Sequence, residues 1–195
     1  MITAEALGAK GVFSDVSFAV PTGAMLVITG DHRAGKTALL LAIARRFSVD
    51  GRLDSAPHRK VALAEQSTVN ALDDALTVEQ HFAQAVVLAR PWYRPFASRA
   101  AAREAASHLP VELPLDAKIG ALTPVERFAC GVGLALVADP EILAVDDVDA
   151  LRETADRVAA WNLLLGLPEN LTIVATCQDA GELPATDRTV VTVAL

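Results

Sequence analysis

The stretch that most constrains the fold is Gly30–Thr37, GDHRAGKT, which follows the apolar run MLVIT and opens a helical pattern. Its spacing, G-x-x-x-x-G-K-T, is that of a phosphate-binding loop when a strand precedes it and a helix follows. Such a loop curls around an anion because backbone N–H groups and the positive end of the helix converge on one point. The motif therefore predicts nucleotide binding on an α/β fold.

The residues of this loop have distinct predicted roles. Lys36 is predicted to reach the β- and γ-phosphates, and the Thr37 hydroxyl to ligate Mg²⁺. The other predicted nucleotide-binding residues belong to the same run of sequence: Gly30, Asp31, His32, Arg33, Ala34, Gly35 and Ala38.

A second set of polar residues follows the apolar pattern ILAV at 142–145. Mg²⁺ that bridges nucleotide phosphates takes carboxylate help, often from the end of a neighbouring strand. Asp146 is the predicted Mg²⁺ ligand. Asp147 is a candidate to orient or deprotonate the attacking water, or alternatively an acidic strand-end residue that caps a loop. Gln66 is a candidate contact to Mg²⁺ or to that water through its amide.

Strand and helix patterns alternate along the chain. Alternating or unbroken apolar runs predict strands at 12–20, 25–29, 61–66, 142–147, 171–176 and 189–195, with a short strand between positions 50 and 60. Helical patterns dominate 77–138, and a further helix is expected around 151–164. The predicted fold class is α/β: a mostly parallel sheet flanked by helices, with an N-terminal antiparallel part and a helical insertion at about 70–138, all in a single domain over residues 1–195.

The helical insertion carries start and stop signals. Thr77, with Gln80 three positions later, has the spacing of a capping box. Ser98 is the expected cap of a second helix, and a third is expected to begin after Thr123 and to stop at Asp139–Pro140.

Composition excludes several classes of protein. A net charge of −7 and a pI near 5.0 do not indicate binding to nucleic acid, because neutralising its phosphates needs clustered Lys and Arg. Cys130 and Cys177 lack metal-ligand spacing, so we expect neither a zinc site nor a disulfide framework. The first residues do not read as a signal peptide, and the most apolar stretch, 131–145, is interrupted too early to span a membrane. Any role at a membrane is expected to come through a partner.

Four motifs together carry a resemblance: GDHRAGKT, then AEQ at 64–66, LTPVER at 122–127 and ILAVDD at 142–147. In this order and spacing they resemble the nucleotide-binding domain of an ATP-binding cassette ATPase, over nearly the whole chain. The resemblance implies ATP and Mg²⁺ as ligands, and a second nucleotide-binding domain, self or heterologous, paired head to tail. It also implies a membrane-spanning subunit, and hence a cytoplasmic location at the inner face of the cell membrane.

The signature segment departs from the family pattern. The family reads L-S-G-G-Q and contacts the γ-phosphate across the dimer, whereas this chain reads Leu122, Thr123, Pro124, Val125, Glu126. Pro124 has no N–H to donate and Val125 brings a Cβ where a backbone must come close. Because Glu126 also adds an anion, the closing clamp is expected to be weak.

The chain also departs from the family pattern at the residues for hydrolysis, within the phosphate loop and near both chain termini. The residue after the Mg²⁺ acid is usually Glu, and the shorter Asp147 is expected to act slowly. Cys177 and Gln178 replace the switch histidine, and neither supplies a cationic imidazole. Arg33 stands where a glycine is common, MITAEALGAK offers no aromatic to stack adenine, and the family's C-terminal helices are expected to be missing.

These substitutions separate binding from turnover and leave two hypotheses. The first is a cassette subunit of a membrane transport or envelope-related complex with weak or regulatory ATPase activity. The second is a non-hydrolysing scaffold that uses ATP as a structural ligand. The segment RPWYRPF, with Trp92, Tyr93 and Phe96, is expected either to dock on the membrane subunit or to fill the small core of the insertion.

Overall fold

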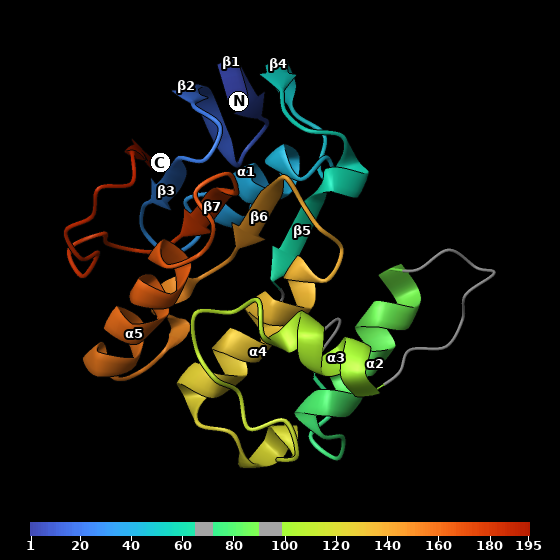
Figure 1. Cartoon of the computed structure of the whole chain (residues 1–195). Helices are drawn as coiled ribbons and strands as arrows, with labels where there is room; N and C mark the ends of the chain where they lie inside the picture. The colour runs from blue at the N-terminus through green and yellow to red at the C-terminus, as the bar shows by residue number, and fades with distance from the viewer. Residues whose placement is uncertain (65–71, 90–98) are drawn as a thin grey trace.

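A computed structural model of the chain describes residues 1–64, 72–89 and 99–195 (Figure 1). Its larger sheet is parallel throughout, in the order β5 (Val61–Ala64), β6 (Ile142–Val145), β7 (Thr172–Thr176), β3 (Met25–Thr29) and β8 (Val190–Ala194). The smaller sheet is antiparallel, in the order β2 (Phe13–Val20), β1 (Ile2–Ala9) and β4 (Asp50–Asp54). The predicted α/β architecture with an antiparallel N-terminal part is confirmed.

The parallel sheet separates two apolar cores. Leu26 and Ile28 face the core formed with α1 (Lys36–Ile43) and the antiparallel sheet. Met25 and Val27 face the opposite core, formed with α4 (Pro124–Leu136) and α5 (Thr154–Leu165). Because β3 is buried on both faces, its sequence is an unbroken apolar run and not an alternating one.

The helical part lies at the end of the molecule away from the antiparallel sheet (Figure 1). Its α2 (Val78–Ala89) buries Val78, Phe82 and Val86 along one face. The capping box also forms, since the Gln80 backbone N–H donates to Thr77 Oγ1 and the Thr77 backbone N–H donates to Gln80 Oε1. The remaining helices are α3 (Arg99–Ala106) and the short 3-10 helices η1 (His58–Lys60), η2 (Ile119–Ala121) and η3 (Val148–Ala150).

The strand β1 is absent from the sequence-based prediction. Its buried side chains are Ile2, Ala4, Leu7 and Ala9, so the buried set changes from even to odd positions along the strand. The change coincides with register shifts against β2 and with Ala6 at φ 48°. A bulge of this kind destroys the period-two pattern from which a strand is identified.

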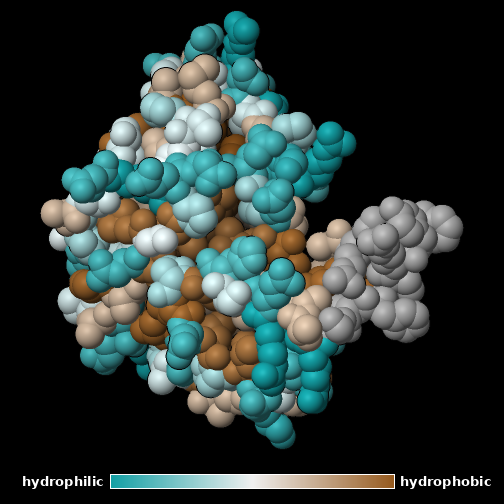
Figure 2. Space-filling model, viewed as in Figure 1, coloured by the Kyte–Doolittle hydropathy of each residue, from teal (hydrophilic) through white to brown (hydrophobic). Residues whose placement is uncertain are grey.

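Apolar residues reach the surface over the helical half, interspersed with hydrophilic ones (Figure 2). A groove of about 430 Å³ between α2, α3 and the end of α4 is lined by Val86, Ala105 and Leu136, with Glu104 and His108 among its polar residues. The predicted docking residues Trp92, Tyr93 and Phe96 lie outside the described residues, as does Ser98.

Candidate nucleotide-binding site

The loop between β3 and α1 has a backbone that requires glycine at two positions. Gly30 has φ 151° and Gly35 has φ 98°, both in the region that favours glycine. A Cβ on Gly30 would lie 2.8 Å from the Leu195 carbonyl oxygen, and one on Gly35 would lie 2.9 Å from Val12 Cγ1. The two glycines therefore hold the loop against β8 and against the turn between β1 and β2.

Arg33 occupies a third left-handed position, with φ 70°. A side chain in this conformation costs about 1 kcal/mol relative to glycine, which explains why a glycine suits the position. The Arg33 side chain is exposed, as are Asp31 and His32, while Ala34 is half-buried and donates its N–H to the Asp31 carbonyl.

The N-terminus of α1 is open. Its N-cap residue, Gly35, offers no side chain to accept from the first-turn amides, and the first turn contains no acid. Ala38 occupies the third helical position there. The first amides of a helix have no intrahelical partner, and with the helix dipole they make a site for an anion.

Lys36 lies at this open end. It is buried, with 8% of its surface exposed, and its ammonium donates to the carbonyls of Gly30 at 2.8 Å and Asp31 at 3.0 Å. These bonds hold the cation beside the loop amides, so one fixed positive charge adds to the helix dipole.

The carboxyl end of β6 meets α1 through a hydroxyl–carboxylate contact. Thr37 Oγ1 donates to Asp146 Oδ2 at 2.9 Å, across 109 positions of sequence. On the other side of Asp146, Thr176 Oγ1 donates to Oδ1 and accepts from the Asp147 amide at 2.7 Å. Sequence reasoning did not single out Thr176, although a threonine at the end of an apolar strand is the available signal.

Asp147 follows directly, in a left-handed conformation with φ 46°. The residue as a whole is exposed, but partial desolvation of its carboxyl raises the pKa, and the charges of Asp146 and Asp149 raise it further against the opposing effect of Lys36 and His32. A raised pKa makes a carboxylate a better proton acceptor and leaves less of it ionised at low pH.

The position that the resemblance gives to a switch histidine holds a neutral thiol. Cys177 is fully buried, and burial, with help from Asp149 and Asp179, raises its pKa to about 12. Its amide donates to the Ile28 carbonyl, and the next amide, that of Gln178, donates to Asp149 Oδ2 at 2.6 Å. The exposed Gln178 side chain is the polar group left at this position.

The signature segment forms the N-terminus of α4, and its polar groups satisfy one another. Thr123 is the N-cap and Pro124 the first helical residue. The Thr123 hydroxyl accepts from the Glu126 amide and donates to Glu126 Oε2 at 2.9 Å, while the Thr123 amide donates to the same oxygen at 2.8 Å. This is a complete capping box, with an anion already placed on the helix end.

The structure thus gathers most of the predicted site residues at the carboxyl end of the parallel strands. The loop Gly30–Thr37, Ala38, Asp146 and Asp147 lie together there, while Gln66 lies outside the described residues. The donor set fits Mg²⁺ with a nucleotide: hydroxyl and carboxylate oxygens are the ligands that Mg²⁺ prefers, and an open helix end with a lysine suits a polyphosphate.

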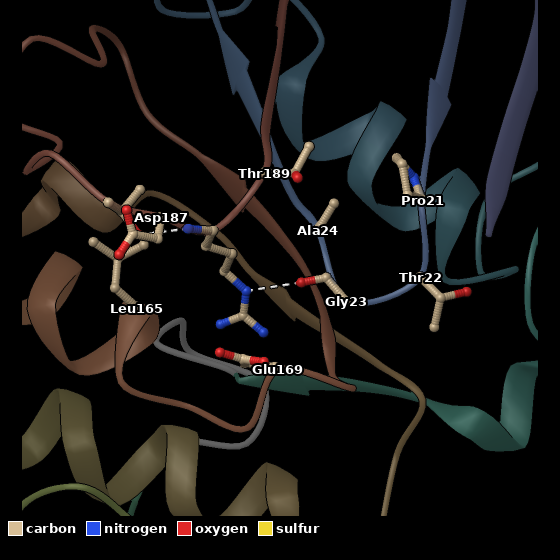
Figure 3. A pocket seen from close by; sticks show the side chains of 10 residues that line it. Pro21, Thr22, Gly23, Ala24, Leu165, Glu169, Asp187 and Thr189 are labelled. Atoms are coloured by element: carbon tan, nitrogen blue, oxygen red, sulfur yellow. Dashed lines mark hydrogen bonds between the residues drawn. The ribbon is translucent and has the colours of Figure 1, made fainter.

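A pocket of about 410 Å³ at the amino end of the strands has a different character (Figure 3). Arg188 is the basic residue of its lining, and Arg188 Nε donates to the carbonyl of Gly23, which is labelled in Figure 3. The other guanidinium nitrogens also donate to backbone carbonyls, those of Leu164, Leu167, Pro168 and Leu171. All three nitrogens are therefore used to close the turns around α5 and β3.

Residues 13–150 match the family model described as ABC transporter. A comparison with curated proteins finds no match. Solved structures share the fold at low identity, among them CbiO1 from Clostridium perfringens, part of the ABC transporter complex CbiONQ, with 15% identity and a TM-score of 0.78 over 94% of this chain and 80% of that one.

Two further structures are similar. A putative ABC transporter ATP-binding protein from Pyrococcus furiosus is 16% identical, with a TM-score of 0.75 over 100% of this chain and 96% of that one. A dimeric ATP-binding cassette in a post-hydrolysis state, bound to ADP and Pi, is 17% identical, with a TM-score of 0.67 over 94% of this chain and 90% of that one.

Proposed function

The chain belongs to the ABC transporter family, and we propose that it is an ATP-binding cassette subunit that binds Mg·ATP and couples it to a membrane transport or envelope-related partner. On this proposal residues 1–195 form one nucleotide-binding domain, with a helical part at about 70–138. We also propose that the ATPase activity of the chain is weak or regulatory.

One observation carries the nucleotide assignment. The Thr37 hydroxyl donates to the Asp146 carboxylate at 2.9 Å, so a residue of the phosphate loop after β3 lies against an acid at the end of β6, the second strand away from β3 in the sheet. A hydroxyl and a carboxylate at the mouth of an anion-binding loop are what a metal-bound polyphosphate needs.

The chain's own residues divide the binding between them. The loop amides and the open end of α1 face the phosphates, and Lys36 neutralises charge on the β- and γ-oxygens. Thr37 and Asp146 would hold Mg²⁺, which would supply charge neutralisation to the phosphates. Gln66 remains a proposed contact to the metal or to water.

Weak turnover is supported by three features of the site. Asp147 offers a carboxylate that is one methylene shorter than glutamate, and misplacement by ~1 Å can lower a rate by ~10²-fold. The α4 N-terminus carries its own anion, Glu126, and so is a poor contact for a partner's nucleotide. The neutral Cys177 thiol provides no cation at the switch position.

Both possible pairings lead to low turnover. In a pair of identical chains, each ATP site would combine Asp147, one methylene shorter than glutamate, with the capped α4 N-terminus of the other chain. A heterologous cassette with an intact signature would complete the ATP site of this chain. The ATP site of that cassette would instead face the capped α4 N-terminus of this chain and would be weakened. Pairing of either kind is part of the proposal, supported by the dimeric cassette that shares the fold.

The membrane partner is proposed from the family and not from a contact surface. Within residues 1–64, 72–89 and 99–195, the structure has no helix with the length and apolar character of a membrane crossing. CbiO1, which shares the fold, is part of a transporter complex. We place this chain in the cytoplasm, at the inner face of the membrane through such a partner, with docking through Trp92, Tyr93 and Phe96 as a hypothesis.

Equilibrium binding of a fluorescent ATP analogue tests the first part of the proposal. The wild-type chain is expected to bind Mg·ATP with a Kd in the micromolar to millimolar range and to gain thermal stability from it. Lys36→Ala is expected to abolish both effects. The proposal fails if ATP gives no thermal shift, or if Lys36→Ala leaves that shift unchanged.

A turnover assay with the membrane partner present separates the cassette from the alternative, a non-hydrolysing scaffold. The closed end of α4 is the observation that favours the scaffold. Asp147→Asn abolishes phosphate release if the chain is a slow ATPase and changes nothing if it is a scaffold. Asp147→Glu, which restores the missing methylene, is expected to raise the rate about 10-fold or more in the first case only.

A further inference from the structure

We propose that Thr176 is a positioning residue of the nucleotide site, whose buried hydroxyl fixes the Asp146 carboxylate for Mg²⁺ and the backbone of Asp147 beside it. The inference rests on the proposed function, because it concerns the same Mg·ATP site. It adds a buried residue of β7 that lies outside the phosphate loop in sequence.

The hydroxyl of Thr176 uses its donor and an acceptor at once. The residue has 0% of its surface exposed. Its single proton goes to Asp146 Oδ1 at 2.5 Å, and the oxygen accepts from the Asp147 amide at 2.7 Å. Since a hydroxyl has one proton and the amide can only donate, these directions are fixed.

Asp146 is consequently held from two sides. Thr176 on β7 donates to one carboxylate oxygen, and Thr37 on α1 donates to the other at 2.9 Å. A carboxylate pinned at both oxygens does not rotate about its terminal torsion, and hydrogen-bonded partners of this kind orient a metal ligand. With its proton committed to Asp146, the Thr37 oxygen keeps its lone pairs for a cation.

The second task of Thr176 concerns the backbone. Asp147 has φ 46° and ψ 59°, a left-handed conformation that is sterically unfavourable for an L-residue. The bond from its amide to Thr176 is a tertiary contact that holds the residue in this conformation. Loss of the Thr176 hydroxyl would remove this hydrogen-bond partner from both the Asp147 amide and Asp146 Oδ1.

The same strand supplies a matched control. Thr172 lies four residues before Thr176, on the same face of β7, with 2% of its surface exposed. Its hydroxyl also accepts from a backbone amide, that of Gly23 at 3.0 Å, but at the opposite end of the strand; Gly23 is a lining residue of the pocket in Figure 3. The two threonines thus match in type, strand and burial, and differ in their distance from the nucleotide site.

The experiment compares Thr176→Val, Thr176→Ser and Thr172→Val. The affinity for a fluorescent ATP analogue is measured with Mg²⁺ and with EDTA, and the tightening by Mg²⁺ is the readout. Thr176→Val is expected to lose about 10-fold of that tightening, with its affinity in EDTA unchanged, because the change acts on the metal ligand. Thr176→Ser, which keeps the hydroxyl, and Thr172→Val are expected to retain the wild-type tightening.

Several results would overturn the inference. They are full tightening in Thr176→Val, an equal loss in EDTA and in Mg²⁺, or the same loss of tightening in Thr172→Val. If the valine variant does not fold, Thr176→Ala removes the same hydroxyl and carries the same prediction, while a serine variant that loses the tightening contradicts it. A wild-type chain without Mg²⁺-dependent ATP binding would instead overturn the proposed function.

Discussion

The helices α1 and α4 both begin at segments that the family resemblance assigns to nucleotide phosphate, and their N-termini differ in the cap and in the third helical residue. The third residue of α1 is Ala38, and the third residue of α4 is Glu126. The α1 end has no side-chain cap, whereas the α4 end is closed by the capping box of Thr123 and Glu126. A helix end binds an anion only while its first amides are free, so the two ends are chemically opposite.

This contrast separates binding from closure within one chain. The open end, with Lys36 and the Thr37–Asp146 contact, keeps what a Mg·nucleotide needs. The closed end gains local stability from its own glutamate instead of offering amides to a second molecule. On our proposal the chain therefore holds ATP well and contributes poorly to a composite site.

Closing the open end should have the largest effect. Ala38→Glu places a carboxylate at the third position of α1, as Glu126 does in α4. Two charges about 4 Å apart near a protein surface interact by ~4 kcal/mol before salt screening, so ATP affinity is expected to fall at least ~100-fold. Ala38→Gln, of equal size and neutral, is the control for steric effects. Equal losses in the two variants would contradict the electrostatic account.

Removing the charge from the closed end should have the next largest effect. Glu126→Gln can keep the capping geometry, since glutamine also serves in a capping box, and it deletes the anion. ATP-dependent self-association of the chain, followed by analytical ultracentrifugation, is expected to tighten by about 10-fold, or ~1.4 kcal/mol. Unchanged association would show that Glu126 is not what closes this end.

Breaking the cap itself tests stability and not binding. Thr123→Ala removes the hydroxyl that accepts from the Glu126 amide and should lower the free energy of unfolding by about 1 kcal/mol, measured by urea denaturation. ATP affinity at the chain's own loop should not change, because that loop belongs to α1. Thr123→Ser, which keeps the hydroxyl, should unfold at nearly the wild-type urea concentration.

Relieving strain in the open loop should have the smallest effect. Arg33→Gly removes a side chain from a left-handed backbone position and is expected to raise the free energy of unfolding by roughly 0.5–1 kcal/mol. Arg33→Ala keeps the unfavourable conformation and removes the charge, so it separates strain from any phosphate contact. A glycine variant no more stable than the alanine variant would count against strain.

Local motifs made much of the fold and of the binding loop predictable. Gly30–Thr37 is contiguous, and the apolar runs of β3, β6 and β7 follow from burial on both faces. The capping box of α4 was accessible too, since Thr123 and Glu126 have its spacing, although comparison with the family signature draws attention to their mismatch instead.

Non-local features were not predictable. Thr176 lies 30 positions from Asp146, and only the parallel pairing of β6 and β7 brings the two residues together. The strand β1 was missed because its bulge at Ala6 shifts the buried set by one residue. In both cases the missing information is register, which no short window of sequence contains.

A single-turnover experiment tests the central claim most directly. The chain, at a concentration above its Kd, is mixed with trace labelled ATP and Mg²⁺; binding is followed at equilibrium, and quenched samples identify the nucleotide over time. We predict that the label is bound by the wild-type chain, is not bound by Lys36→Ala, and remains ATP for many minutes. Failure to bind ATP, or its conversion to ADP at an ordinary enzymatic rate of about 1 s⁻¹ or faster, would contradict the account.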